Sequence, residues 1–234
     1  MSKKVRKQKK RNTKKFRKNI KSKIQNPNQG NKQLIRDINF LNKLNDKFVF
    51  PTEIINSERV LFTPSYKTLN PSIQNQIENH LSEYPIIKKG CFVNGTLLSL
   101  KVSGMKTVHG YYGNTIESEF GVKGSNPNHH RYSSLINICL NSNEKYVEVE
   151  KDIILDTQKK KIWYKHCWNK VGDVHIDMTV EVQRLKNNSF NGFMEYLECD
   201  SFDSSSMSEF ILMEKKGLTN SIHYSQSGIK YFLN

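Results

Sequence analysis

The chain has 234 residues and a mass of 27.3 kDa, with a net charge of +15 and a mean hydropathy of −0.67. This length suits one domain with a core and a tail, or two small domains, and an apolar share of 36% predicts that some segment does not fold. No apolar run approaches the roughly 18 residues of a membrane span, and the charged start is not followed by the apolar stretch of a secretory signal. We therefore expect no membrane span and an intracellular protein of the cytoplasm or nucleus, or a virion-associated one, that is not secreted.

The positive charge is concentrated at the start of the chain. Residues 1–24 contain thirteen lysines or arginines and no acidic residue, whereas the rest of the chain has 24 basic and 22 acidic residues. We predict a disordered polybasic tail and linker over residues 1–30, followed by a single domain over residues 31–234. Such a tail binds the phosphates of nucleic acid or another polyanion without reading sequence, and it equally suits nuclear targeting. The predicted polyanion-binding residues are Lys3, Lys4, Arg6, Lys7, Lys9, Lys10, Arg11, Lys14, Lys15, Arg17 and Lys18.

Helical patterns occupy the first part of the predicted domain. Apolar residues recur at helical spacing over residues 34–44. A second helix is predicted after Asn70, which can cap it, with Pro71 at its first position and Pro85 beyond its end. A third helical stretch opens at Cys91.

Beyond Gly104 the apolar pattern changes to the period of two that is typical of strands. The stretch GVKGSNPNHHRYSS (residues 121–134) is predicted to be a surface loop. Helices followed by strands indicate the α+β class, with N-terminal helices packed on an antiparallel sheet. The predicted strands cover residues 106–113, 134–140, 145–150, 160–168, 174–182 and 193–198.

The stretch KIWYKHCWNKVGDVHIDMTVEV (residues 161–182) predicts two strands joined by a tight turn, in which Gly172 can take a positive φ. A short loop centred between Val171 and Gly172 places His166 directly opposite Asp177, with Cβ atoms about 4.5–5.5 Å apart on one face of the sheet. An imidazole in that place donates its ring N–H to the carboxylate, which fixes the tautomer and stabilises the imidazolium. The pair is therefore the candidate orienting half of a nucleophilic triad.

Cys91 is the candidate nucleophile. It follows Gly90 at the start of a helical stretch, where the helix dipole and the free backbone N–H groups favour a thiolate and can stabilise an oxyanion. Each of these residue types also occurs in purely structural roles, and a cross-strand His–Asp pair can be simple decoration of a sheet. Spacing alone leaves both interpretations open.

Three blocks of sequence add a resemblance to a known group of proteins. GCFVNGTLLSL (residues 90–100), VHGYYG (108–113) and KHCWNKVGDVHIDMT (165–179) resemble the papain-like and transglutaminase-like cysteine hydrolase superfamily. Similar members carry a nucleophilic Cys at a helix start, an Asn soon after it, a Gly-aromatic strand, a His with a Trp two residues on, and an Asp. The resemblance implies a papain-like or transglutaminase-like core.

The same resemblance implies that Cys91 is the nucleophile, His166 the base and Asp177 the orienting acid. Two departures from the pattern are visible. Met178 stands where relatives have Pro between the Asp and a Thr, and the segment between VHGYYG and the His strand is long. We therefore expect a substrate cleft that differs from that of the superfamily.

Asn94 and Trp168 are the predicted supporting residues. Asn94 can hold the Cys91 loop by a hydrogen bond or can be an ordinary polar helix residue, and Trp168 is expected in the core or in a cleft wall. His129 and His130 are adjacent, but no Cys or His pair has the spacing of zinc ligands. We therefore expect no metal and no cofactor.

These features predict a thiol-dependent acyl-transfer enzyme that hydrolyses an amide, peptide or isopeptide bond of a protein or peptide substrate. The remaining cysteines, Cys139, Cys167 and Cys199, are expected to be structural thiols. The alternative function is that of a non-enzymatic nucleic-acid-binding or virion-type structural protein that keeps the fold.

Deletion of residues 1–24 tests the predicted division of the chain. We expect the intact protein to bind heparin with an affinity that falls steeply with salt, because its cations release counterions from the polyanion. The truncated protein should bind weakly and keep its melting temperature. Binding isotherms at several salt concentrations measure this, and equal binding by both proteins would place the basic surface in the domain.

Overall fold

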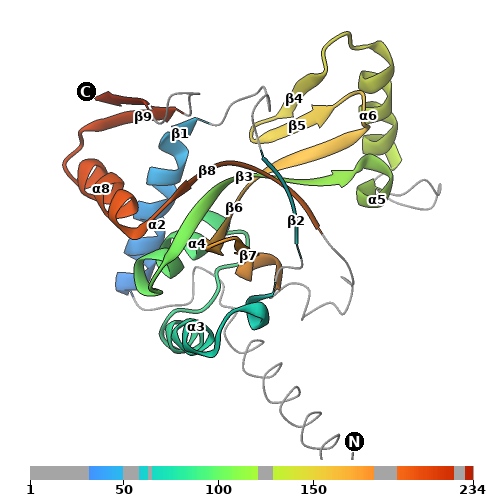
Figure 1. Cartoon of the computed structure of the whole chain (residues 1–234). Coiled ribbons are helices and arrows are strands. Elements are labelled where there is room, and N and C mark those ends of the chain that lie inside the picture. Colours follow the sequence, from blue (N-terminus) through green and yellow to red (C-terminus); the bar gives the residue numbers. More distant parts are fainter. Residues whose placement is uncertain are drawn as a thin grey trace, which may run out of the picture.

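The computed structural model describes residues 32–49, 58–62, 65–120, 129–181, 194–223 and 230–233. These residues form an α+β fold in which helices pack against a mainly antiparallel sheet, as the sequence predicts (Figure 1). The predicted basic tail and linker lie outside the described residues. No helix of the described ranges is long and apolar enough to cross a bilayer.

The central sheet carries the candidate site. Neighbouring strands in it are antiparallel, and β3 lies between β8 and β6 (Figure 1). In spatial order the strands are β2 (Glu58–Phe62), β8 (Met194–Phe202), β3 (Met105–Thr115), β6 (Lys161–Val171), β5 (Ile153–Asp156) and β4 (Tyr146–Glu150).

The outer edge of β6 is shared by two short strands with a gap between them. Residues 161–164 pair with β5, and residues 169–171 pair with β7 (Val174–Ile176). Among the described residues no strand pairs with this edge over residues 165–168. Within the gap the Lys165 N–H donates to the Asp152 carbonyl at 2.8 Å, and the candidate site is built at the residues that follow.

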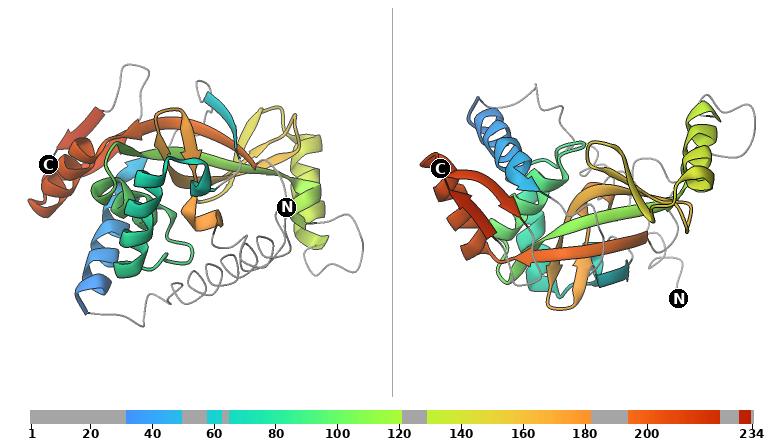
Figure 2. Two further views of the ribbon diagram at one scale, coloured as in Figure 1. Left: turned by 60° about the horizontal axis from the view of Figure 1, so that its bottom comes forward. Right: turned by 90° about the horizontal axis from the view of Figure 1, so that it is seen from above.

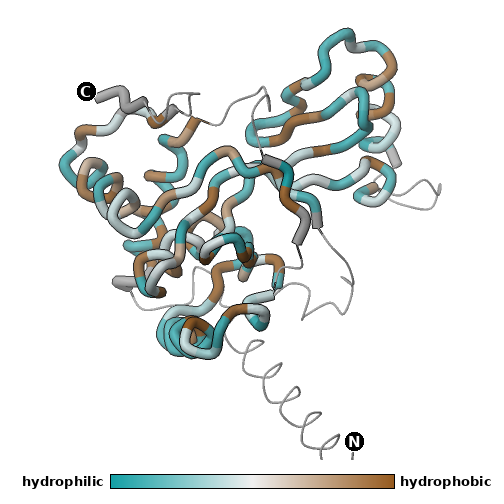
Figure 3. The backbone as a smooth tube through the Cα atoms, in the orientation of Figure 1, coloured by the Kyte–Doolittle hydropathy of each residue, from teal (hydrophilic) through white to brown (hydrophobic). Residues whose placement is uncertain are grey.

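Three helices cover one face of the sheet. They are α2 (Lys32–Lys47), α4 (Cys91–Lys101) and α8 (Ser204–Lys215) (Figure 1). Hydrophobic residues gather where α4 meets the central strands (Figure 3). Burial of such side chains is the main favourable term in folding. The core of this layer consists of Ile38, Leu41, Leu44, Phe48, Ile87, Phe92, Val93, Cys167, Phe202, Met207, Phe210 and Ile222.

A smaller sheet lies beside these helices. Its strands are β1 (Phe48–Val49), β9 (Thr219–His223) and β10 (Lys230–Leu233), with β9 in the middle. β1 follows α2 directly, so the helix ends where this short strand begins.

The second predicted helix is α3 (Pro71–Glu83), preceded by the short 3-10 helix η1 (Tyr66–Thr68). The Asn70 side chain accepts a hydrogen bond from the Ile73 N–H at 2.9 Å, which confirms the predicted cap. Ile73, Ile77 and Leu81 are buried with Leu98 of α4. α3 therefore supports α4 from the side.

The described elements between β3 and β6 form a lobe at the end of the sheet away from α2 and α8 (Figure 2). It contains α5 (Ile116–Phe120), α6 (His129–Asn141), β4 and β5. The predicted strand at residues 134–140 and the predicted loop at 129–134 are both wrong, because they belong to α6. The helix buries Leu135 and partly buries Tyr132, Ile136 and Cys139, which recur at helical spacing. The predicted strand begins at residue 134 and so leaves Tyr132 out of this pattern.

A close backbone approach fixes the spacing of the central strands. A Cβ atom on Gly110 of β3 would lie 1.9 Å from the backbone oxygen of Leu197 in β8 and 2.8 Å from the Trp168 ring. A side chain can change rotamer, but a backbone carbonyl in a paired strand cannot. Only glycine fits at this position.

We expect Gly110→Ala to destabilise the protein by about 3 kcal/mol, the upper end of ordinary overpacking costs. Gly104→Ala is the matched control, because no atom lies within 4 Å of its added Cβ and only its φ of 71° is unfavourable. The control should cost about 1 kcal/mol. Urea unfolding followed by circular dichroism measures both, and equal losses would contradict the close approach.

Candidate active site

Cys91 is the first residue of α4, as the sequence predicts. Gly90 precedes it as the N-cap and offers no side-chain cap. The first N–H groups of a helix have no partner within the helix, and they form the positive end of its dipole. The thiol is partly buried at this end. A negative charge on the sulfur is therefore favoured by its position.

His166 and Asp177 are in direct contact. The His166 Nε2 atom lies 2.5 Å from Asp177 Oδ2, and the carboxylate is buried with 1% of its side chain exposed. The Tyr196 hydroxyl donates to the same oxygen at 2.9 Å, and the Val180 N–H donates to Oδ1 at 3.0 Å. Three donors thus fix both carboxylate oxygens.

The predicted contact is present, but the predicted strand register is wrong. The hairpin pairs Asn169 with Ile176, whereas a loop centred between Val171 and Gly172 would pair it with Val174. The observed turn is formed by Gly172, with a φ of 55°, and Asp173. The observed pairing differs from the predicted one by two residues, and a shift of two leaves each side chain on the predicted face of the sheet.

The predicted strand over residues 174–182 is also too long, because β7 ends at Ile176. A helical turn follows, in which the Glu181 N–H donates to the Asp177 carbonyl at 2.8 Å. Asp177 caps this turn through its Val180 contact. Its side chain therefore reaches back to His166 from the turn and not from the strand.

The Cys91 thiol is hydrogen-bonded to the His166 ring and to the backbone N–H of Cys167. Because Asp177 occupies Nε2, the ring nitrogen left for the thiol is Nδ1. The Cys167 N–H projects from the open edge of β6, in the gap between β5 and β7. The gap thus admits the start of α4 to the edge of the strand that carries His166.

Charge shifts the pKa of both partners. Burial acts to lower the pKa of His166, but the Asp177 carboxylate and the Cys91 thiolate outweigh it and raise the pKa to about 10. Burial acts to raise the pKa of the Cys91 thiol, but the His166 imidazolium and the two hydrogen bonds outweigh it, so this pKa is lowered. The arrangement therefore favours a thiolate–imidazolium pair at neutral pH.

Asn94 makes the supporting hydrogen bonds that were one of its two predicted roles. Its Oδ1 accepts from the Ile87 N–H at 2.8 Å, and its Nδ2 donates to the Ile87 carbonyl at 2.9 Å. Nδ2 also donates to Thr179 Oγ1 at 2.9 Å. The buried amide thus ties the loop before Cys91 to the turn that carries Asp177.

Trp168 is buried beside the His166 ring, with the two ring planes 16° apart. Its indole N–H donates to His175 Nδ1 at 2.9 Å, and His175 Nε2 lies 3.8 Å from Glu198. Trp168 packs in a core cluster with Val108, Val180 and Tyr196. It therefore holds the core position that was one of its two predicted places.

Sequence reasoning missed Tyr196. It lies on β8, in the predicted strand FMEYLE, and pairs with Tyr112 of β3. The pairing of β8 with β3 joins residues far apart in sequence, so spacing offers no signal for it.

The side chains of the other candidate cysteines and histidines are not among these hydrogen-bond partners. Cys167 is buried on the opposite face of β6, and burial raises its pKa well above the ordinary value. Cys139 lies on α6 and not on the predicted strand. His109 is buried among aromatic rings, and His129 and His130 begin α6. Within the described ranges no three His, Cys, Asp or Glu side chains form a metal-binding group.

Comparison of the chain with family models, with curated proteins and with solved structures finds no match. The chemistry of the site therefore has to be argued from its own geometry.

Two histidines whose pKa values shift in opposite directions, His166 and His80, give a direct test of the electrostatics. We expect His166 to be an imidazolium at neutral pH, and His80 to be neutral because burial and Lys101 lower its pKa to about 4. Asp177→Asn should lower the pKa of His166 and leave that of His80 unchanged. NMR titration of the ring carbons measures both, and a neutral His166 ring in the wild type would contradict the pair.

Proposed function

We propose that the protein is a thiol-dependent acyl-transfer enzyme that hydrolyses an amide, peptide or isopeptide bond. The proposal is carried by one observation: the Cys91 thiol at the start of α4 is hydrogen-bonded to His166, whose other ring nitrogen lies 2.5 Å from Asp177. The nucleophile contacts the base and the base contacts the orienting acid, as in cysteine hydrolases. The likeness of the three sequence blocks to the papain-like and transglutaminase-like superfamily supports the same class.

The proposed reaction has two halves. The Cys91 thiolate attacks the substrate carbonyl carbon, and the tetrahedral oxyanion is stabilised by N–H groups at the start of α4. The His166 imidazolium gives its proton to the leaving amine, so the amide bond breaks and a thioester remains on Cys91. His166 then takes a proton from water as the water attacks the thioester, which releases the acid and restores the thiolate pair.

Asp177 has a positioning role in this scheme. Its carboxylate holds the His166 ring with Nδ1 toward the sulfur and stabilises the imidazolium. Tyr196 and the Val180 N–H hold the carboxylate in turn. Hydrolysis is favoured over cross-linking because water is the acceptor that needs no binding site.

Alkylation by iodoacetamide tests the proposal without knowledge of the substrate. A thiolate reacts and a thiol does not, so the lowered pKa of Cys91 should make it the fastest cysteine to react at and below neutral pH. His166→Ala should slow this alkylation at least tenfold near neutral pH, because the pKa of the thiol returns toward about 8.5. Mass spectrometry of timed samples measures each cysteine separately.

Cys139, Cys167 and Cys199 are controls within the same molecule. Burial raises the pKa of Cys139, which lies on α6 and should not respond to His166→Ala. Burial also raises the pKa of Cys167 well above the ordinary value, so this thiol should react slowly in both proteins. Equal rates at Cys91 and the controls, without dependence on His166, would contradict the enzyme and favour a non-catalytic protein that keeps this fold.

A further inference from the structure

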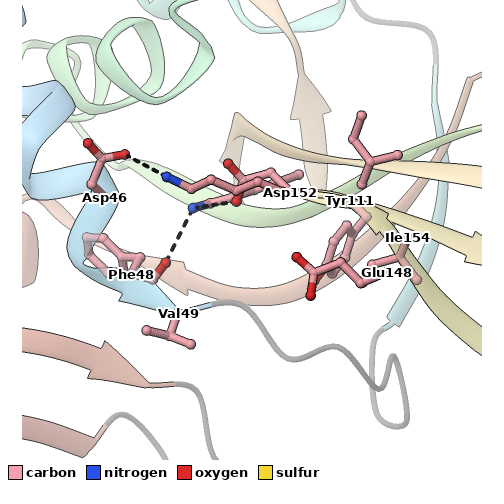
Figure 4. Close-up of a pocket in the computed structure, with 10 residues that line it drawn as sticks. Asp46, Phe48, Val49, Tyr111, Glu148, Asp152 and Ile154 are labelled. Carbon is pink, nitrogen blue, oxygen red and sulfur yellow. Dashed lines mark hydrogen bonds and ion pairs between the residues drawn. The ribbon is translucent and has the colours of Figure 1, made fainter.

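A pocket of about 260 Å³ opens beside the gap in the β6 edge (Figure 4). It is smaller than the roughly 300–1,000 Å³ of ordinary small-molecule sites, so it suits one side chain better than a whole ligand. It is lined by Asp46, Phe48, Val49, Tyr111, Glu148, Lys151, Asp152, Ile153, Ile154 and Lys165.

The pocket lies close to the candidate nucleophile along the strand. The Lys165 N–H donates to the Asp152 carbonyl at 2.8 Å, and the Cys167 N–H donates to the Cys91 thiol. Both N–H groups project from the same edge of β6, two residues or about 6.6 Å apart. A chain bound at Cys91 can therefore place the side chain of an adjacent residue in this pocket.

The lobe formed by α5, α6, β4 and β5 supplies one wall. Glu148 lies on β4, Asp152 in the turn after it, and Ile154 on β5. The opposite wall comes from Phe48 and Val49, which form β1 directly after α2 (Figure 4). The segment whose length departs from the resembled superfamily thus forms part of this pocket, which is where a difference in substrate is to be expected.

One carboxylate of the pocket is not paired with a lysine, so a ligand can pair with it. Lys165 Nζ is held by the Phe48 carbonyl at 3.3 Å and by the Asp152 carboxylate at 3.3 Å. Lys151 faces Asp46 at 4.0 Å. The Glu148 side chain is exposed to solvent, and its carboxylate points toward the space between the lining residues of the pocket (Figure 4). It has no ion pair with any described residue.

The remaining lining is apolar. Phe48, Val49, Tyr111 and Ile154 offer carbon surface between the charged groups. Lysine and arginine bury their methylene stems on such surface while the charged end meets a carboxylate. An acidic side chain would have to displace Asp152 from Lys165 or Asp46 from Lys151.

We infer that this pocket receives a lysine or arginine side chain of the substrate, at a residue next to the bond that Cys91 attacks. The inference rests on the proposed function and adds a substrate class to it: peptides with a basic residue beside the scissile bond. Glu148 is the specificity-determining residue, because it is the carboxylate not engaged by a lysine of the pocket.

Short peptides with an electrophile test the inference. One series carries lysine, norleucine or glutamate before a vinyl sulfone, and a second carries the same residues after a bromoacetyl group, so both sides of the attacked carbon are sampled. In one of the series the lysine probe should label Cys91 about fivefold faster than the norleucine probe. This ratio corresponds to the roughly 1 kcal/mol that an exposed ion pair contributes.

Two variants assign the preference. Glu148→Gln should bring the lysine and norleucine rates within about twofold, and Glu148→Lys should make the glutamate probe the faster one. Glu117→Gln removes the same charge from an exposed position on α5 that does not line the pocket, and it should keep the wild-type preference. Thermal melting verifies that all three variants are folded.

Iodoacetamide labelling of the same proteins separates the two proposals. If iodoacetamide labels Cys91 in a His166-dependent manner while lysine, norleucine and glutamate probes react equally in both series, the pocket inference is overturned and the proposed function stands. If iodoacetamide does not prefer Cys91, the proposed function fails and the inference fails with it. A preference that survives Glu148→Gln also overturns the assignment of Glu148.

Discussion

The site depends on the hydrogen bonds that the Asp177 carboxylate accepts. The carboxylate is buried, and it accepts hydrogen bonds from His166, from the Tyr196 hydroxyl and from the Val180 N–H. A carboxylate buried without hydrogen-bond partners costs several kcal/mol, and these three donors offset that cost. β6, β8 and the turn after β7 must all be in place before this charge is compensated. The geometry of the base is thus tied to the folding of the sheet.

The nucleophile is fixed to the same strand by a second set of buried contacts. Asn169 of β6 donates to the Gly95 carbonyl of α4 at 2.8 Å, and Thr107 of β3 donates to the same carbonyl at 3.3 Å. Asn94 adds three hydrogen bonds to the loop before the helix and to Thr179. Each such bond contributes about 1 kcal/mol, and more is lost when a buried partner is left unpaired. The start of α4 therefore has little freedom to move away from His166.

The sequence predicted the parts of the fold that depend on local signals. The cap at Asn70, the helix start at Cys91 and the alternation in β3 and β6 were all readable. The contact between His166 and Asp177 is present although the register was wrong, because a shift of two residues keeps the predicted face and the Asp177 side chain reaches His166 from the turn after β7. The parts that failed depend on distant chain segments: Tyr196 arrives on a strand paired across the sheet, and the pocket joins the end of α2 to the β4–β5 turn. The helix α6 was misread because part of its apolar face also fits a strand.

The charge state of Cys91 is the central claim, and the ultraviolet absorbance of the thiolate measures it directly. The difference in absorbance between the wild type and Cys91→Ser, followed as a function of pH, isolates this one sulfur. The account predicts a transition below the free-thiol value of about 8.5, which moves upward in His166→Ala. A transition at or above that value, unchanged by His166→Ala, would contradict the thiolate–imidazolium pair.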